Sequence, residues 1–149
     1  MEDSLIRSTV AIILSVVIAF ILVVAVEAVS SVLHPWPDDF SGSLEEILNQ
    51  VESYPSWVLA LLGGVGYGTT MFVCTFVATR LGSKKNVWHG YGIGLFLFSM
   101  VVCNMIQLPY PIWFWGMMFT ILPVAAYFGT MLGNRSTALC RKESTVIEE

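Results

Sequence analysis

Five polar side chains within or beside apolar stretches could together form a binding site. Glu27, Ser31 and His34 follow one another at spacings of four and three residues, which places them on one face of a helix. Asn104 and Gln107 stand near the end of a later apolar stretch. A charged side chain costs at least ~2.5 kcal/mol at the bilayer centre and less toward the interface, so Glu27 needs protonation or an amide partner. We predict that these five side chains line a polar pocket for a proton, an ion or a ligand.

Two other interpretations of the acidic residue stay open. A single glutamate near the end of a membrane helix is also typical of a structural hydrogen-bonding residue that locks a bundle. Alternatively, Glu27 contacts another protein. The residue types alone do not decide between these roles and a functional site.

The sequence favours neither a metal centre nor an enzyme. Glu27 and His34 stand seven residues apart, a long reach for a shared metal, and the chain has no HExxH motif or paired cysteine ligands. His34 and His89 belong to opposite membrane faces, which excludes a shared haem. The chain also lacks a GxSxG motif and a phosphate-binding loop. We therefore expect no metal, no cofactor and no enzymatic activity.

The elements that must position these side chains are membrane helices. Of 149 residues, 56% are hydrophobic and only 12% are charged, about half the charged share of a soluble domain. Residues 8–33 form an apolar stretch long enough to cross the roughly 30 Å hydrocarbon core of a bilayer. The fold class is therefore all-α: an integral membrane four-helix up-down bundle at residues 1–133, followed by a polar, disordered cytoplasmic tail at 134–149. The expected membrane helices cover residues 8–33, 57–79, 87–108 and 112–132.

A short amphipathic helix is expected in the acidic loop between the first two membrane helices, at about residues 43–53. Ser43 and Glu46 have the spacing of a capping box. Helical spacing predicts an apolar face, which could pack over the polar pocket as a lid. A solvated loop that only enforces topology is the alternative. The expected apolar face consists of Leu44, Ile47, Leu48 and Val51.

The distribution of basic residues predicts the orientation. All 7 Lys and Arg residues fall before the first membrane helix, between the second and third, or after the fourth. The positive-inside rule places these segments in the cytoplasm, so both termini are inside and the acidic loop is outside. Glu27 and Asn104 then lie at about the same height, roughly 10 Å toward the outer side of the bilayer centre, and could meet in the core. Basic residues scattered in this way do not favour nucleic-acid binding.

Three pairs of small residues favour close helix packing. Each pair has the GxxxG spacing that lets another helix backbone approach closely. Four helices do not need three such ridges internally, so we expect one to face another chain in a homo-oligomer or a larger membrane complex. The three pairs are Gly64 with Gly68, Gly90 with Gly94, and Gly129 with Gly133.

The order of several short motifs resembles a group of small bacterial proteins. After Glu27 comes His34-Pro35-Trp36-Pro37, and Asn104 precedes Leu108-Pro109-Tyr110-Pro111-Ile112-Trp113. This order is similar to that of a widespread group of uncharacterised four-helix bacterial inner-membrane proteins. The resemblance implies the four-helix fold and a bacterial inner-membrane location. It implies no activity, since none is established for the group.

The function expected first is that of a non-enzymatic accessory or assembly subunit in the lipid bilayer, acting through helix packing. The alternative is a small transporter or proton-coupled carrier that uses Glu27 in an outward-opening polar pocket.

Overall fold

Every secondary-structure element in the described residues is helical. The computed structural model describes residues 2–82 and 87–147, with side chains described for residues 6–82 and 87–135. No strand occurs within these ranges, so the all-α prediction is confirmed. The elements are α1 (Glu2–Leu33), α2 (Leu44–Glu52), α3 (Ser56–Ala60), the π-helix η1 (Leu61–Tyr67), α4 (Gly68–Leu81), α5 (Trp88–Gln107) and α6 (Ile112–Ile147).

Four helical segments are long and apolar enough to cross a membrane. One segment combines α3, η1 and α4 into a continuous helix, and the others lie in α1, α5 and α6. Many large apolar side chains are exposed on their outer surfaces. The four segments are Ile6–Leu33, Ser56–Leu81, Trp88–Gln107 and Ile112–Arg135.

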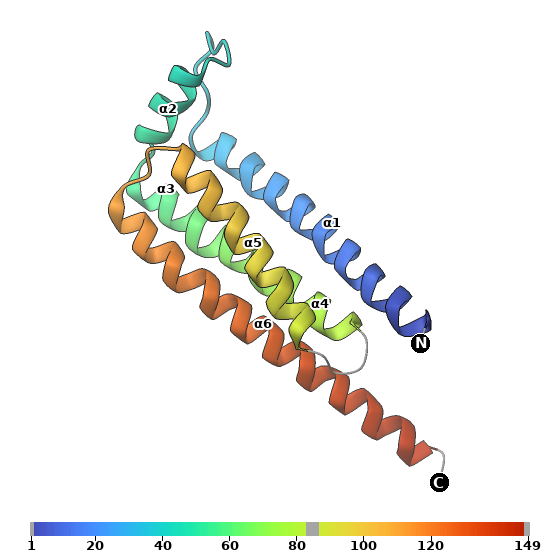
Figure 1. Ribbon diagram of the computed structural model, residues 1–149. Coiled ribbons are helices and arrows are strands. Elements are labelled where there is room, and N and C mark those ends of the chain that lie inside the picture. The colour runs from blue at the N-terminus through green and yellow to red at the C-terminus, as the bar shows by residue number, and fades with distance from the viewer. Residues whose placement is uncertain (1, 83–86, 148–149) are drawn as a thin grey trace.

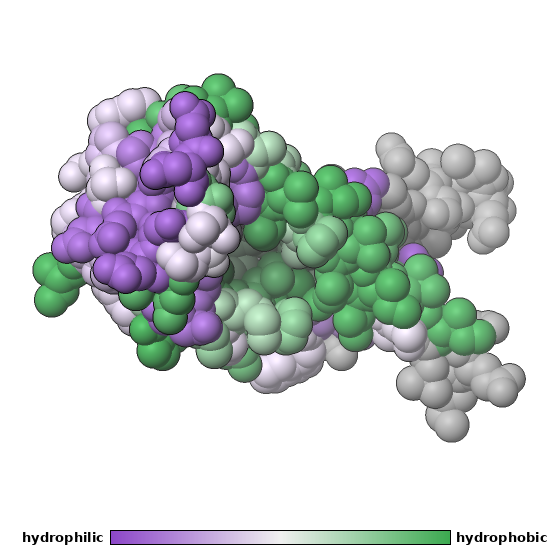
Figure 2. All heavy atoms as spheres, turned by 90° about the horizontal axis from the view of Figure 1, so that it is seen from above, coloured by the Kyte–Doolittle hydropathy of each residue, from purple (hydrophilic) through white to green (hydrophobic). Residues whose placement is uncertain are grey.

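The second of these segments occupies the middle of the molecule. Its α4 portion packs against α1, α5 and α6, and most extensively against α6. Successive long helices run in opposite directions, so that α2 lies at one end and the starting end of α1 lies at the other (Figure 1). Viewed from the α2 end, hydrophilic residues gather over that end and hydrophobic residues cover the long helices behind it (Figure 2).

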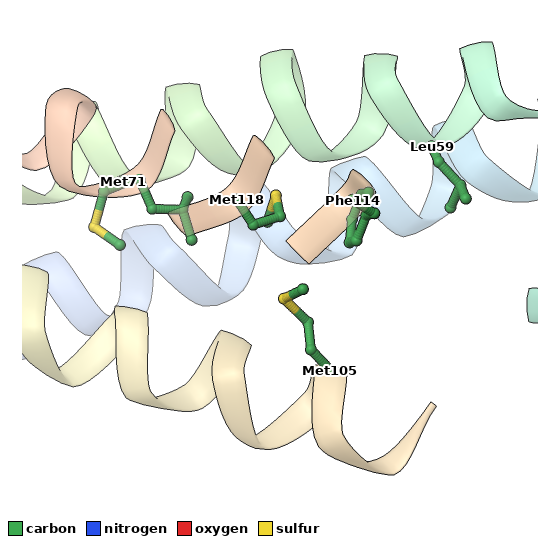
Figure 3. Close-up of a cluster of buried hydrophobic side chains, with 6 residues drawn as sticks. Leu59, Met71, Met105, Phe114 and Met118 are labelled. Carbon is green, nitrogen blue, oxygen red and sulfur yellow. The ribbon is translucent and has the colours of Figure 1, made fainter. Parts of the chain in front are cut away.

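A methionine-rich core joins α3, α4, α5 and α6. Met105 points from α5 toward Phe114 and Met118 of α6, in a cluster of side chains that are at most 6% exposed (Figure 3). Methionine is flexible and polarisable, which suits a core between helices that approach at uneven distances. The cluster consists of Leu59, Met71, Met105, Phe114, Met118 and Leu122.

All three small-residue pairs lie in contacts between helices of this chain. Gly129 and Gly133 of α6 face α4, where an added Cβ at Gly129 would overlap the side chain of Thr75. Gly64 and Gly68 face Ile121 of α6. The pair on α5 also faces inward, with Gly90 against Thr79 and Thr130 and Gly94 against Thr75 and Ala126.

The second membrane segment differs from the single α-helix expected over residues 57–79. Its middle turns form the π-helix η1, which contains Gly63, Gly64 and Gly66. Glycine is conformationally permissive and leaves room for close neighbours. A Cβ at Gly63 would lie 2.6 Å from the ring of Phe114, and one at Gly66 would lie 2.9 Å from Val26. The π-helix therefore brings the backbone close to both α1 and α6.

The ends of α1 and α6 also differ from those expected for the first and fourth membrane helices. α1 ends at Leu33, before the Pro35 and Pro37 that predicted its end, but it begins at Glu2 rather than near residue 8. The candidate membrane span in α6 is Ile112–Arg135, close to the expected 112–132, but the helix itself continues to Ile147, through residues expected to form a disordered tail. No proline follows Pro123, and the residues after Gly133 include several good helix formers.

The helix α2 has the predicted N-cap but only part of the predicted apolar face. The hydroxyl of Ser43 accepts a hydrogen bond from the Glu46 amide at 3.3 Å. The Glu46 carboxylate accepts from the amide and hydroxyl of Ser41, at 2.8 and 3.0 Å. Val51 is buried and Ile47 and Leu48 are partly buried, whereas Leu44 is 69% exposed. The apolar face is therefore restricted to the C-terminal part of the helix.

Candidate functional site

A cavity of about 290 Å³ lies at the α2 end of the molecule. Its walls come from α1, α2, the α3–η1 region, α5, α6 and the turns between them. Apolar residues such as Ile47 and Val51 of α2 form one part of the lining. The polar side chains that line it are Glu27, Ser30, Tyr54, Tyr67, Asn104 and Tyr110.

A residue of the π-helix forms a hydrogen bond with the Glu27 carboxylate. The hydroxyl of Tyr67, the last residue of η1, donates a hydrogen bond to Glu27 Oε1 at 2.9 Å. The preceding Gly66 packs against Val26, the residue before Glu27. The close approach that glycine permits therefore sets the height of Tyr67 opposite the carboxylate.

Glu27 has no cationic partner within the described residues. No salt bridge joins it to a described Lys, Arg or His, and its one hydrogen bond there comes from a neutral phenol. The nearest basic residues in the sequence, Arg7 and Arg80, lie toward the other end of the molecule, where Arg7 Nε donates to the Leu81 carbonyl at 3.1 Å. The cavity therefore contains a carboxylate whose charge this part of the chain does not balance.

Asn104 lies on the same cavity as Glu27, as their similar height predicts. Its side-chain amide makes no hydrogen bond to any described residue, and it is exposed. An amide offers two donors and an acceptor, so Asn104 is available to a bound molecule.

Two further hydrogen bonds fasten the α2 region to the end of α1. Ser30 Oγ and the Tyr54 hydroxyl lie 2.6 Å apart. His34 Nε2 and Ser53 Oγ lie 2.9 Å apart, and the His34 ring packs against Tyr54 with centroids 4.5 Å apart. These contacts hold Tyr54 beside the cavity.

Tyr110 completes the aromatic part of the lining from the turn between α5 and α6. Burial, followed by the negative charge of Glu27, raises the pKa of Tyr110 to about 12. Its ring stacks on Phe114, with centroids 4.7 Å apart and an interplanar angle of 21°. Tyr110 therefore stays a neutral phenol at physiological pH, close enough to Glu27 to sense its charge.

Three of the five predicted pocket residues do not line this cavity. Ser31 Oγ donates to the Ala28 carbonyl at 2.9 Å, and Gln107 Nε2 donates to the Cys103 carbonyl at 3.0 Å. His34 instead bonds to Ser53, as described above.

Helix geometry explains these three placements. The cavity face of α1 includes Val26, Glu27 and Ser30, and Ser31 lies about 100° around the helix from Ser30. Gln107 lies about 200° from Met105, which points into the core, so it faces away from the bundle.

Four of the polar side chains named above for the cavity are absent from the set predicted by sequence. Ser30, Tyr54, Tyr67 and Tyr110 all line the cavity. The only signals for the tyrosines are Tyr54-Pro55 and Pro109-Tyr110-Pro111, which mark the ends of helices on the same side as Glu27. Nothing in the sequence marks Tyr67, because its position depends on the π-helix.

The described residues do not contain a group of three or more side chains suited to hold a metal ion. No family model matches the chain, and no curated protein or solved structure shows significant similarity to it. The resemblance to small bacterial four-helix membrane proteins therefore stays a prediction.

Proposed function

We propose that the chain crosses a bacterial inner membrane four times, with both termini in the cytoplasm and α2 outside. The apolar length and surface of the four segments support insertion in a bilayer. The hydrogen bond from Arg7 to Leu81 brings the first two basic segments to one end, and the acids of residues 38–52 lie near the other. The positive-inside rule assigns the basic end to the cytoplasm.

Within this topology, we propose a small carrier that uses the Glu27 cavity as its binding site and couples transport to a proton on Glu27. One observation supports this proposal above the others. A carboxylate on a membrane helix faces a cavity shared by several elements and has no cationic partner among the described residues. Ionisable residues at membrane depth typically face a cavity and mark substrate or proton pathways.

A carrier must also change shape, and the element beside Glu27 is suited to that. π-Helical turns are rare and frequently lie at functional sites. η1 carries Tyr67 at one end and contacts α1 through Gly66. A change in η1 would therefore move the hydrogen-bond donor of Glu27 directly.

The accessory-subunit function was expected because one of the three GxxxG pairs should face another protein, and the contacts of these glycines do not support that argument. All six glycines of the three GxxxG pairs contact helices of this same chain. They provide no free small-residue ridge for another protein. A subunit role would need a different contact surface, and it is the outcome favoured if the carrier test fails.

The test is proton-coupled flux in proteoliposomes. A pH-sensitive dye in the lumen reports proton movement while amines, organic acids and sugars are added one at a time outside. We expect one class to drive a change in lumenal pH in the wild-type protein, and we expect Glu27→Gln to abolish it while thermal stability stays unchanged. Glu45→Gln is the matched control, because Glu45 carries the same carboxylate on α2 but does not line the cavity.

Two results together would reject the carrier. These are wild-type vesicles that respond like protein-free vesicles to every compound, and a Glu27→Gln protein that melts several degrees lower than wild type. That combination assigns Glu27 a structural role in locking the bundle.

A further inference from the structure

The cavity chemistry also indicates what the carrier would transport, an inference that rests on the proposed function. We propose that the Glu27 cavity binds a small organic ammonium cation. The carboxylate supplies the opposite charge, and the rings of the surrounding tyrosines supply a cation-binding wall.

One oxygen of the Glu27 carboxylate is open to the cavity. Tyr67 occupies Oε1, and no described residue bonds to Oε2. Phenols, amides and hydroxyls line the rest of the polar surface, with no Lys or Arg among the lining residues. An anionic ligand would face uncompensated repulsion there, whereas an ammonium group gains a charge-assisted contact.

The aromatic argument concerns the wall around that charge. Tyr54, Tyr67 and Tyr110 line the cavity together with Trp36 and Phe114, so five aromatic side chains share the space with one carboxylate. A cation within about 6 Å of such ring centroids is attracted by their negative faces, and quaternary ammonium ligands are recognised in this way.

The size of the cavity and the side chains that line it favour a compact organic cation over calcium. About 290 Å³ is at the small end for ligand pockets, which suits a compact ligand with few heavy atoms. Calcium takes six to eight oxygen ligands, and a single described carboxylate beside neutral phenols falls short of that. A compact organic cation uses both the charge and the rings.

The experiment measures binding rather than flux. Choline is the probe, and 3,3-dimethylbutan-1-ol, its uncharged carbon isostere, is the control ligand. Both are titrated into the full-length protein in dodecyl maltoside, whose head group is uncharged, by isothermal titration calorimetry. We expect choline to bind at least tenfold more tightly than the isostere.

Variants locate the binding to this cavity. We expect Glu27→Gln to weaken choline binding at least tenfold, Glu27→Asp to retain part of it, and Glu45→Gln to bind like wild type. Tyr110→Leu, which removes the ring, should weaken choline binding several-fold more than Tyr110→Phe, which keeps it. Melting temperatures of all variants are measured in the same detergent, and Glu27→Asp keeps the test valid if Glu27→Gln unfolds.

Several outcomes would overturn the proposal: no binding of choline, equal binding of the isostere, or unchanged binding in Glu27→Gln. These outcomes are distinct from failure of the carrier. Choline binding without proton-coupled flux rejects the carrier and retains the cation site. Flux driven by an uncharged or anionic compound, without choline binding, retains the carrier and rejects this substrate class.

Discussion

Two polar regions lie within the apolar helices, and they use their polar groups in opposite ways. The first is a threonine–glycine seam between α4, α5 and α6, formed by Thr75, Thr79, Gly90, Gly129 and Thr130. Thr75 and Thr79 donate to carbonyls four residues earlier in their own helix, at 2.9 and 2.8 Å. Glycine faces threonine across each contact, so the seam has no room for a ligand.

The second region is the Glu27 cavity, where hydrogen bonds join different elements. Tyr67 of η1 bonds to Glu27 of α1, and Ser30 of α1 bonds to Tyr54 of the loop after α2. The space between these elements is left open rather than filled. The two regions therefore differ in two ways: the threonines of the seam bond within their own helix where no space is left, whereas the bonds beside Glu27 run between elements and border a cavity.

The largest expected effect on stability comes from a substitution in the threonine–glycine seam. In Gly129→Ala the new Cβ would overlap the backbone carbonyl oxygen of Phe72 and the side chain of Thr75, which is fully buried. Overpacking of this kind costs about 3 kcal/mol, so the melting temperature should fall by several degrees. Thermal denaturation in detergent measures the loss.

Gly116→Ala is the matched control for that variant. It makes the same change on the same helix, but nothing lies within 4 Å of the added Cβ. We expect its stability to equal or slightly exceed that of wild type, because alanine favours helix over glycine. Equal melting temperatures for the two variants would show that the seam is not closely packed.

A smaller effect is expected in the cavity. Tyr67→Phe removes the hydroxyl that bonds to Glu27 and keeps the ring, so the loss should be about 1 kcal/mol in stability. Its functional effect should be larger, since Glu27 loses the donor that fixes its position. We expect clearly reduced flux with a melting temperature only a few degrees below that of wild type. Tyr127→Phe is the control, because Tyr127 is about half exposed on α6 and lies outside this cavity.

The opposite pattern would contradict the distinction between the two regions. If Tyr67→Phe melts far below wild type and retains its transport, the Tyr67–Glu27 bond belongs with the structural contacts of the seam.

Hydropathy and proline placement predict most of the fold. Apolar stretches locate all four long helices, and Pro35 locates the end of α1. Such signals work because they depend on local sequence and on the thickness of a bilayer. Hydropathy and proline placement do not predict the π-helix, because a glycine-rich stretch such as 63–66 is equally compatible with a regular α-helix. Its geometry depends on what packs beside it, namely Val26 and Phe114.

The candidate site is predicted only in part for a related reason. The rise per residue in a helix is nearly constant, so the sequence predicts how far along its helix each residue lies. This predicts correctly that Glu27 and Asn104 line the same cavity. The sequence says less about how a helix is rotated about its own axis. For this reason the prediction places Ser31 in the cavity, where the structure has Ser30. The tyrosines depend on turns and on η1, which long-range packing determines.

The smallest expected effect concerns the N-terminus of α2, which lies outside the membrane segments. Hydrogen bonds from the Ser41 amide and hydroxyl lower the pKa of Glu46 below its usual value of 4.5. The ionised carboxylate therefore stabilises α2 at neutral pH, and this contribution is lost as the pH falls through the lowered pKa. We expect the protection of amides 44–52 from hydrogen exchange to decline slightly on acidification below about pH 4.5. Glu46→Gln should show lower protection at pH 7 and little further change in acid, because its amide does not ionise. If both proteins lose protection equally between pH 7 and pH 3, the Ser41–Glu46 contact does not stabilise the helix.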